Sequence, residues 1–237
     1  MNLVNQLQNL STSVEFVAAI VGAIVGSIAA GAISYLMQRQ MLREDRKKRK
    51  EDSAEKLEAA ALSLFFKLQA CMNDLRTLAD HVVDAQAFAE RESWDLWQAL
   101  IPIPNLPPIQ VFVSDDLATL VRLKDFDLYN KVRDVEVTHR SMIDSMHLYL
   151  KVRSELGRAM GADISGTHSV SPLTAEDQRR VGPMILETGG LAQSIADTVV
   201  DDAETAKDAF ERYNASLKAL IGHSFTIEYV RRSELKN

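Results

Sequence analysis

Residues 57–82 read LEAAALSLFFKLQACMNDLRTLADHV, and in this stretch an apolar residue recurs at alternating steps of four and three positions. Such spacing places the apolar side chains along one side of an α-helix and is typical of a seam that packs against other helices. Cys71 occupies one seam position, so we interpret it as a buried small apolar residue rather than a reactive thiol. The seam consists of Leu57, Ala61, Leu64, Leu68, Cys71, Leu75, Leu78 and Val82.

Two later stretches carry seams of the same kind. The second seam lies in a helix predicted over residues 127–156, and the third belongs to a helix that Gly222 closes. Three long seams predict an antiparallel helical bundle with long, coiled-coil-like helices. The second seam contains Leu128, Val132, Val135, His139, Met142, Met146, Tyr149, Arg153 and Leu156, and the third contains Leu191, Ile195, Val199, Ala206, Phe210, Tyr213, Leu217 and Leu220.

A proline-rich stretch separates the first two seams. Ser93 is expected to cap a short helix before it, and Ser114 to cap a helix over residues 115–124 after it. The prolines force an extended turn between these helices, and they stand at positions 102, 104, 107 and 108.

One small β element is also predicted. Ile109, Val111 and Val113 recur at every second position as in a short strand, and apolar residues recur in the same way in residues 225–229. The two stretches are expected to pair as a two-stranded ribbon, which alone is marginally stable. The predicted fold class is therefore all-α, with this ribbon as its one candidate β element.

The helix that carries the third seam has its own signals. Thr174 followed by Asp177 predicts an N-terminal cap. Pro183 and the pair Gly189–Gly190 are expected to kink or split this helix.

Before the first seam lies a stretch without formal charge, from Phe16 to Met37. At ~1.5 Å per residue a helix of this length reaches about 33 Å, close to the ~30 Å hydrocarbon core of a bilayer. A cleaved signal peptide carries its positive charges before the apolar run, whereas here Lys and Arg follow it. A buried core helix is the remaining alternative. We expect a single transmembrane helix over residues 14–37.

The transmembrane helix is followed by a basic collar. Residues 39–50 hold seven Lys and Arg against Glu44 and Asp45, a net charge of +5. The positive-inside rule then predicts that the N-terminus faces out and the C-terminal domain is cytoplasmic, at the inner (plasma) membrane of a bacterium. The collar also suits anionic lipid headgroups, and it consists of Arg39, Arg43, Arg46, Lys47, Lys48, Arg49 and Lys50.

Few residues that would interrupt a helix lie between the apolar stretch and the first seam. No glycine occurs between Gly31 and Gly157. The membrane helix is therefore expected either to run on past residue 90 or to restart at Asp52, which forms a capping box with Glu55. The predicted organisation is a short extracytoplasmic N-terminus (1–13), the span (14–37), the collar (38–52) and a cytoplasmic helical bundle (53–237).

Small residues recur every four positions in the span. Such rows let another helix approach closely, so we expect a homo-oligomer or a contact with a different membrane protein. One row is Ala18, Gly22, Gly26 and Ala30, and the other is Ala19, Ala23, Ser27 and Gly31.

Composition excludes some classes of function. Residues 51–237 hold 20 basic and 30 acidic side chains, and this net charge of −10 argues against nucleic acid as the partner. The single cysteine permits no intramolecular disulfide and suits a reducing compartment.

No catalytic motif and no cofactor signature is found, so we expect a non-enzymatic protein that acts by oligomerisation or partner binding, as a scaffold, sensor or regulatory effector. One alternative is a metal-binding or enzymatic bundle that uses two carboxylate-histidine pairs on one helix, although one metal cannot easily take both. The pairs are Glu136 with His139 and Asp144 with His147. A second alternative is an effector that perturbs the bilayer by clustering its spans.

Overall fold

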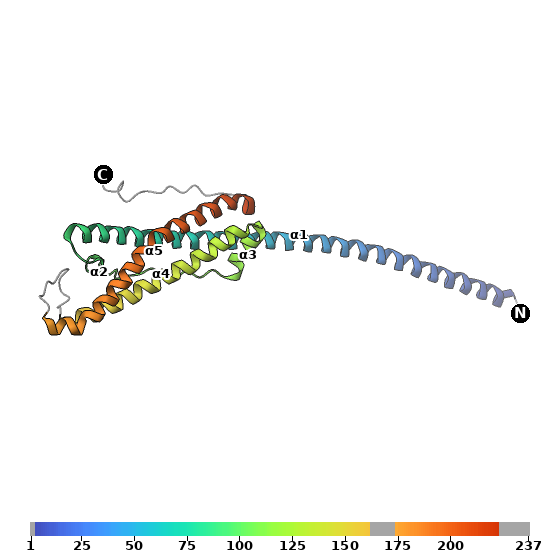
Figure 1. The fold of residues 1–237 in the computed structure, drawn as a ribbon. Helices are drawn as coiled ribbons and strands as arrows, with labels where there is room; N and C mark the ends of the chain where they lie inside the picture. The colour runs from blue at the N-terminus through green and yellow to red at the C-terminus, as the bar shows by residue number, and fades with distance from the viewer. Residues whose placement is uncertain (1–2, 162–173, 223–237) are drawn as a thin grey trace, which may run out of the picture. The chain divides into compact units, whose positions relative to one another are not determined.

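The computed structural model describes the backbone of residues 3–161 and 174–222, and their side chains from Val17 onward except Ala29. All regular structure in these ranges is helical (Figure 1). The predicted all-α helical bundle is confirmed for the described residues. The helices are α1 (Leu3–Glu92), α2 (Leu96–Ala99), α3 (Ser114–Leu123), α4 (Phe126–Ala159) and α5 (Ala175–Ile221).

Helix α1 is continuous and contains both the apolar N-terminal stretch and the first seam. Asp52 and Glu55 lie inside it, so the predicted restart at Asp52 does not occur. The absence of glycine and proline between Gly31 and the end of α1 at Glu92 leaves nothing that would interrupt the backbone hydrogen bonds. The chain divides into two compact units, one that ends at Lys56 and one that begins at Leu57.

The three seams form the core of the second unit. Leu68 of α1, Val135 of α4 and Val199 of α5 are each 0% exposed. Aromatic rings join the helices as well, since the ring centroids of Phe65 in α1 and Phe210 in α5 lie 5.2 Å apart. The predicted seams are confirmed except near their ends, where four positions are only half-buried: Leu57, Arg153, Leu191 and Leu220.

The bundle is only partly antiparallel. Helix α5 runs against α1, because Tyr213 contacts Ala61 while Gly189 lies near Trp97, which follows α1 (Figure 1). Helix α4 runs in the same direction as the packed part of α1: His139 lies beside Asp74, and Tyr149 beside Trp97. The proline-rich segment explains this difference from the prediction, since it returns the chain to the start of the bundle before α4 begins.

The caps of the two short helices differ from their predictions. Ser93 has a φ of 54°, and α2 begins three residues later, with Asp95 as its N-cap. Helix α3 begins at Ser114 itself, and the carboxylate of Asp116 accepts a 2.9 Å hydrogen bond from the backbone N–H of Val113. Asp115 and Asp116 still stabilise the first turn, because negative charge is favourable at a helix N-terminus.

The predicted ribbon is wrong for the part of it that the structure describes. Residues 109–113 are extended but form no strand. The N–H of Phe112 donates to a side chain, the Glu136 carboxylate, at 3.0 Å, and not to a neighbouring strand. The other half of the predicted ribbon, residues 225–229, lies outside the described residues.

Helix α5 is not split. Pro183 lies inside it, and Gly189 and Gly190 are helical too. Helix α2 packs on α5 at Gly189, where an added Cβ atom would make an ordinary van der Waals contact, 3.6 Å from Cδ1 of Trp97. The predicted caps are confirmed at both ends: the Thr174 hydroxyl accepts from the Asp177 N–H at 3.1 Å, and Gly222 ends the helix with a φ of 79°.

Candidate membrane segment and buried polar networks

The first unit contains one helical stretch that is long and apolar enough to cross a membrane, with a mean hydropathy of 2.1. Its described side chains are exposed on every side of the helix; Ile28, for example, is 68% exposed and Leu36 61%. Burying one such side chain is worth about 1.5–3 kcal/mol, so an apolar environment would stabilise a helix that is apolar all round. Length and composition fit a membrane anchor or a signal sequence.

The small-residue row of this stretch is open. Cβ atoms added at Gly22 and Gly26 would meet no other atom within 4 Å. In the second row, the Ser27 hydroxyl donates to the carbonyl of Ala23 at 2.7 Å. The Ser27 hydroxyl is therefore satisfied within the helix, which suits an apolar environment.

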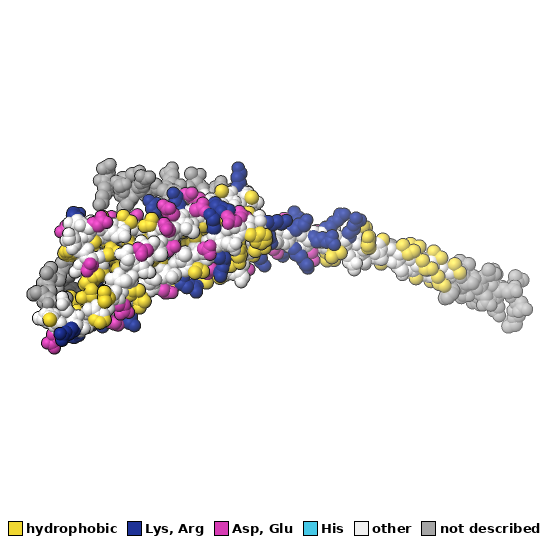
Figure 2. Space-filling model, in the orientation of Figure 1, with side chains coloured by type: hydrophobic (Ala, Val, Ile, Leu, Met, Phe, Trp, Pro, Cys, Tyr) yellow, Lys and Arg dark blue, Asp and Glu magenta, His cyan; other side chains and the backbone are white. Residues whose placement is uncertain are grey.

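All seven basic residues of the collar are exposed. In Figure 2, Lys and Arg side chains gather on α1 directly after the apolar stretch. Lys47 lies 3.8 Å from Glu51 in a solvent-exposed pair, which contributes little stability. The charges of the collar are thus available to an external partner.

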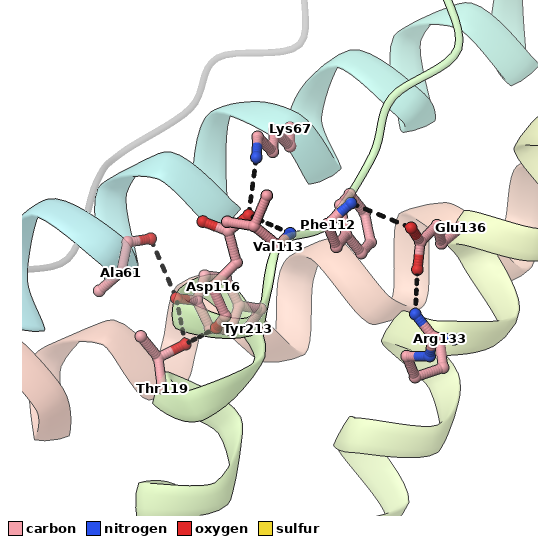
Figure 3. A network of polar contacts seen from close by, with 9 residues as sticks. All are labelled: Ala61, Lys67, Phe112, Val113, Asp116, Thr119, Arg133, Glu136 and Tyr213. Atoms are coloured by element: carbon pink, nitrogen blue, oxygen red, sulfur yellow. Dashed lines mark hydrogen bonds and ion pairs between the residues drawn. The ribbon is translucent and has the colours of Figure 1, made fainter.

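Asp116 is the centre of a buried polar network in the second unit (Figure 3). Its carboxylate is 2% exposed and accepts from Lys67 of α1 at 2.7 Å, in addition to the Val113 N–H. A buried carboxylate is tolerated only when its charge and lone pairs are satisfied. This network fixes the start of α3 on α1.

Tyr213 of α5 completes the same network. Its hydroxyl donates to the carbonyl of Ala61 at 3.0 Å and lies 3.4 Å from the Thr119 hydroxyl, which itself donates to the carbonyl of Asp116 at 2.6 Å (Figure 3). Burial raises the pKa of Tyr213 to about 12, and the nearby Asp116 charge acts in the same direction. The phenol therefore stays protonated and acts as a hydrogen-bond donor between α5 and α1.

A second buried carboxylate holds the proline-rich segment. Glu136 of α4 is 6% exposed and accepts from the Phe112 N–H and from the guanidinium of Arg133 (Figure 3). Further along α4, the hydroxyl of Tyr149 donates to the carbonyl of Leu100 at 2.8 Å, and Arg153 donates to the same carbonyl. These contacts fasten both ends of the segment to α4.

The structure does not bring the two carboxylate-histidine pairs together. His139 is fully buried and its Nε2 lies 3.1 Å from Asp74 of α1, whereas Asp144 and His147 are exposed. Among the described residues, no group of three or more His, Cys, Asp or Glu side chains is placed to hold a metal ion. Of these side chains, His139 joins α4 to α1 through Asp74, while Glu136 and Asp144 both line an open depression on α4.

Cys71 is fully buried, as its seam position predicts. Desolvation and, to a smaller extent, the charges of Asp74 and Glu136 together raise the pKa of its thiol from 9.0 to about 12. The thiolate is the reactive form, so the folded protein contains almost none at neutral pH.

We therefore expect Cys71 to resist alkylation at pH 8 in the folded protein and to react fully in denaturant. The folded pKa lies above the unfolded one, so the neutral thiol's contribution to stability is present below about pH 9 and is lost as the pH rises toward 12. Thiol labelling followed by mass spectrometry measures this. Rapid labelling of the native protein would contradict the buried placement.

The sequence alone did not predict that Asp116, Glu136 and Arg153 hold the extended segment and the start of α3 in place. Their only sequence signal is a charged residue within or beside a seam, and this does not reveal which backbone group it binds. No protein-family model, curated protein or solved structure matches this chain. We therefore infer a function from its own residues.

Proposed function

We propose that this chain is a single-pass membrane protein whose cytoplasmic helical bundle acts by self-association or partner binding, as a scaffold, sensor or regulatory effector. The observation that carries the proposal is the apolar helix of residues 17–37, whose described side chains are all exposed and which is followed at once by the basic collar. A soluble protein would leave this surface in contact with water at a large cost. Insertion of residues 14–37 into a bilayer removes that cost.

The orientation follows from the collar. Its net charge of +5 stands on the C-terminal side of the span, and positive charge is retained in the cytoplasm. The proposed location is the inner (plasma) membrane of a bacterium, with the N-terminus outside and the bundle inside. The single cysteine, Cys71, suits the reducing cytoplasm.

The described residues also favour a role in interaction. Their buried polar side chains join α1, α3, α4 and α5. The open rows of small residues on α1 offer a surface for a second helix. Two associated spans hold their bundles at high effective concentration, which strengthens even weak contacts between bundles.

Two measurements test the anchoring and the orientation. The protein is expected to stay with membranes after alkaline carbonate extraction, and a reporter fused after Asn237 is expected to be active only if it functions in the cytoplasm. Deletion of residues 14–37 is the control and should release the protein into the soluble fraction. Periplasmic reporter activity would contradict the orientation, and carbonate release of the intact chain would contradict the anchor.

A further inference from the structure

The charges of the collar are distributed unevenly around α1. At about 100° per residue, four of the seven basic residues fall within an arc of roughly 60° on one side of the helix. We name this set the basic stripe, and its members are Arg39, Arg43, Arg46 and Lys50.

The acidic side chains of the same stretch lie on the other side. By the same helical geometry they are all within about 70° of the direction opposite the basic stripe. The acidic residues are Glu44, Asp45, Glu51 and Asp52, and all are exposed. Because α1 is continuous through this region, the helix presents a positive face and a negative face.

From this one-sided charge we propose that the basic stripe binds anionic phospholipid headgroups and draws that side of α1 toward the membrane surface. The proposal rests on the anchoring proposed above. It names the lipid class that the collar selects and the face that contacts it.

The position of the basic stripe along α1 favours lipid over an acidic protein. Arg39 follows Met37 by two residues, or about 3 Å along the axis, and Arg43 by about 9 Å. The headgroup region on each side of a bilayer is about 5–7 Å thick, and long basic side chains extend toward it. The attraction between the basic side chains and the headgroups therefore decreases along the helix toward Lys50. A tilt of α1 toward the side of the basic stripe brings all four charges closer to the membrane surface.

The test compares two triple variants of the full-length protein, reconstituted in phosphatidylcholine bilayers. One variant replaces Arg43, Arg46 and Lys50 of the stripe with Gln. The matched control replaces Lys47, Lys48 and Arg49 with Gln; it removes the same charge from the same stretch, but from three different sides of the helix. Electron spin resonance with spin-labelled phosphatidylglycerol or phosphatidylcholine gives the relative association constant of the two lipids.

Wild-type protein is expected to bind phosphatidylglycerol roughly tenfold more strongly than phosphatidylcholine, since each basic residue near the surface contributes about fivefold at most. The stripe variant should lose most of this preference, and the control variant should keep more than half of it. Added salt should weaken the wild-type preference.

Three results would overturn the proposal. They are equal binding of both lipids by wild type, equal losses in the two triple variants, and a stripe variant that keeps its lipid preference but loses a bound acidic protein. Carbonate extraction of the same samples separates the two proposals. If wild type is released from the membrane, the anchoring fails and this inference fails with it. If wild type is retained without a lipid preference, only this inference fails.

Discussion

Leu68→Ala is expected to lower the free energy of unfolding by about 2–5 kcal/mol. Leu68 lies in the middle of the first seam and is 0% exposed, so truncation removes buried apolar atoms and leaves a cavity among α1, α4 and α5. Thermal or urea unfolding of the full chain in mild detergent, followed by far-ultraviolet circular dichroism, measures the change.

Leu148→Ala is the matched control. It makes the same chemical change on α4, but Leu148 is 47% exposed and its truncation leaves an open surface rather than a cavity. We expect a loss of less than about 1 kcal/mol there. Equal losses in the two variants would contradict the placement of the first seam in the core.

Gly26→Ile is expected to weaken self-association by roughly 5- to 30-fold. Lipid is already apolar, so two spans gain little from hydrophobic burial and associate through close packing of small residues. A branched side chain at Gly26 would separate the helices along the row that Gly22 shares. Ile keeps the segment apolar, so insertion should not change.

The measurement is the oligomer distribution in detergent, by cross-linking or mass photometry at matched expression. Val25→Ile is the control, because it adds a methyl group about 100° around the helix from Gly26. A monomeric wild type, or a Gly26→Ile variant that assembles as well as wild type, would show that this row is not the interface.

The helices that pack in the bundle were predictable because burial on one side leaves a periodic trace. The seams around Leu68, Val135 and Val199 are regular in steps of three and four, and all three positions are buried. Thr174 and Gly222 were predictable for a local reason, since caps depend on the hydrogen bonds and dihedral angles of a few neighbouring residues.

The path of the chain between seams was not predictable in the same way. The alternation of Ile109, Val111 and Val113 suggested a strand, but in the structure Phe112 is buried while Val111 and Val113 are exposed, so the alternating side chains are not the ones that pack inward. The partner of Phe112 is Glu136, a side chain 24 residues away. Such a long-range contact has no periodic signal, and the same holds for the parallel directions of α1 and α4.

The contact between Tyr213 and Ala61 joins residues 152 positions apart. The packed part of α1 can therefore be covered only after α5, the last helix of the bundle, has been synthesised. During synthesis, the apolar seam of α1 leaves the ribosome long before the α5 residues that cover it. At about 5–20 residues per second, the interval between Val82 and Leu217 is on the order of 10 s. For that time the nascent chain leaves Leu64, Leu68 and their neighbours uncovered by α5. A chaperone that binds short apolar helices can therefore bind the seam of α1 during this interval, which ends only when translation is almost complete.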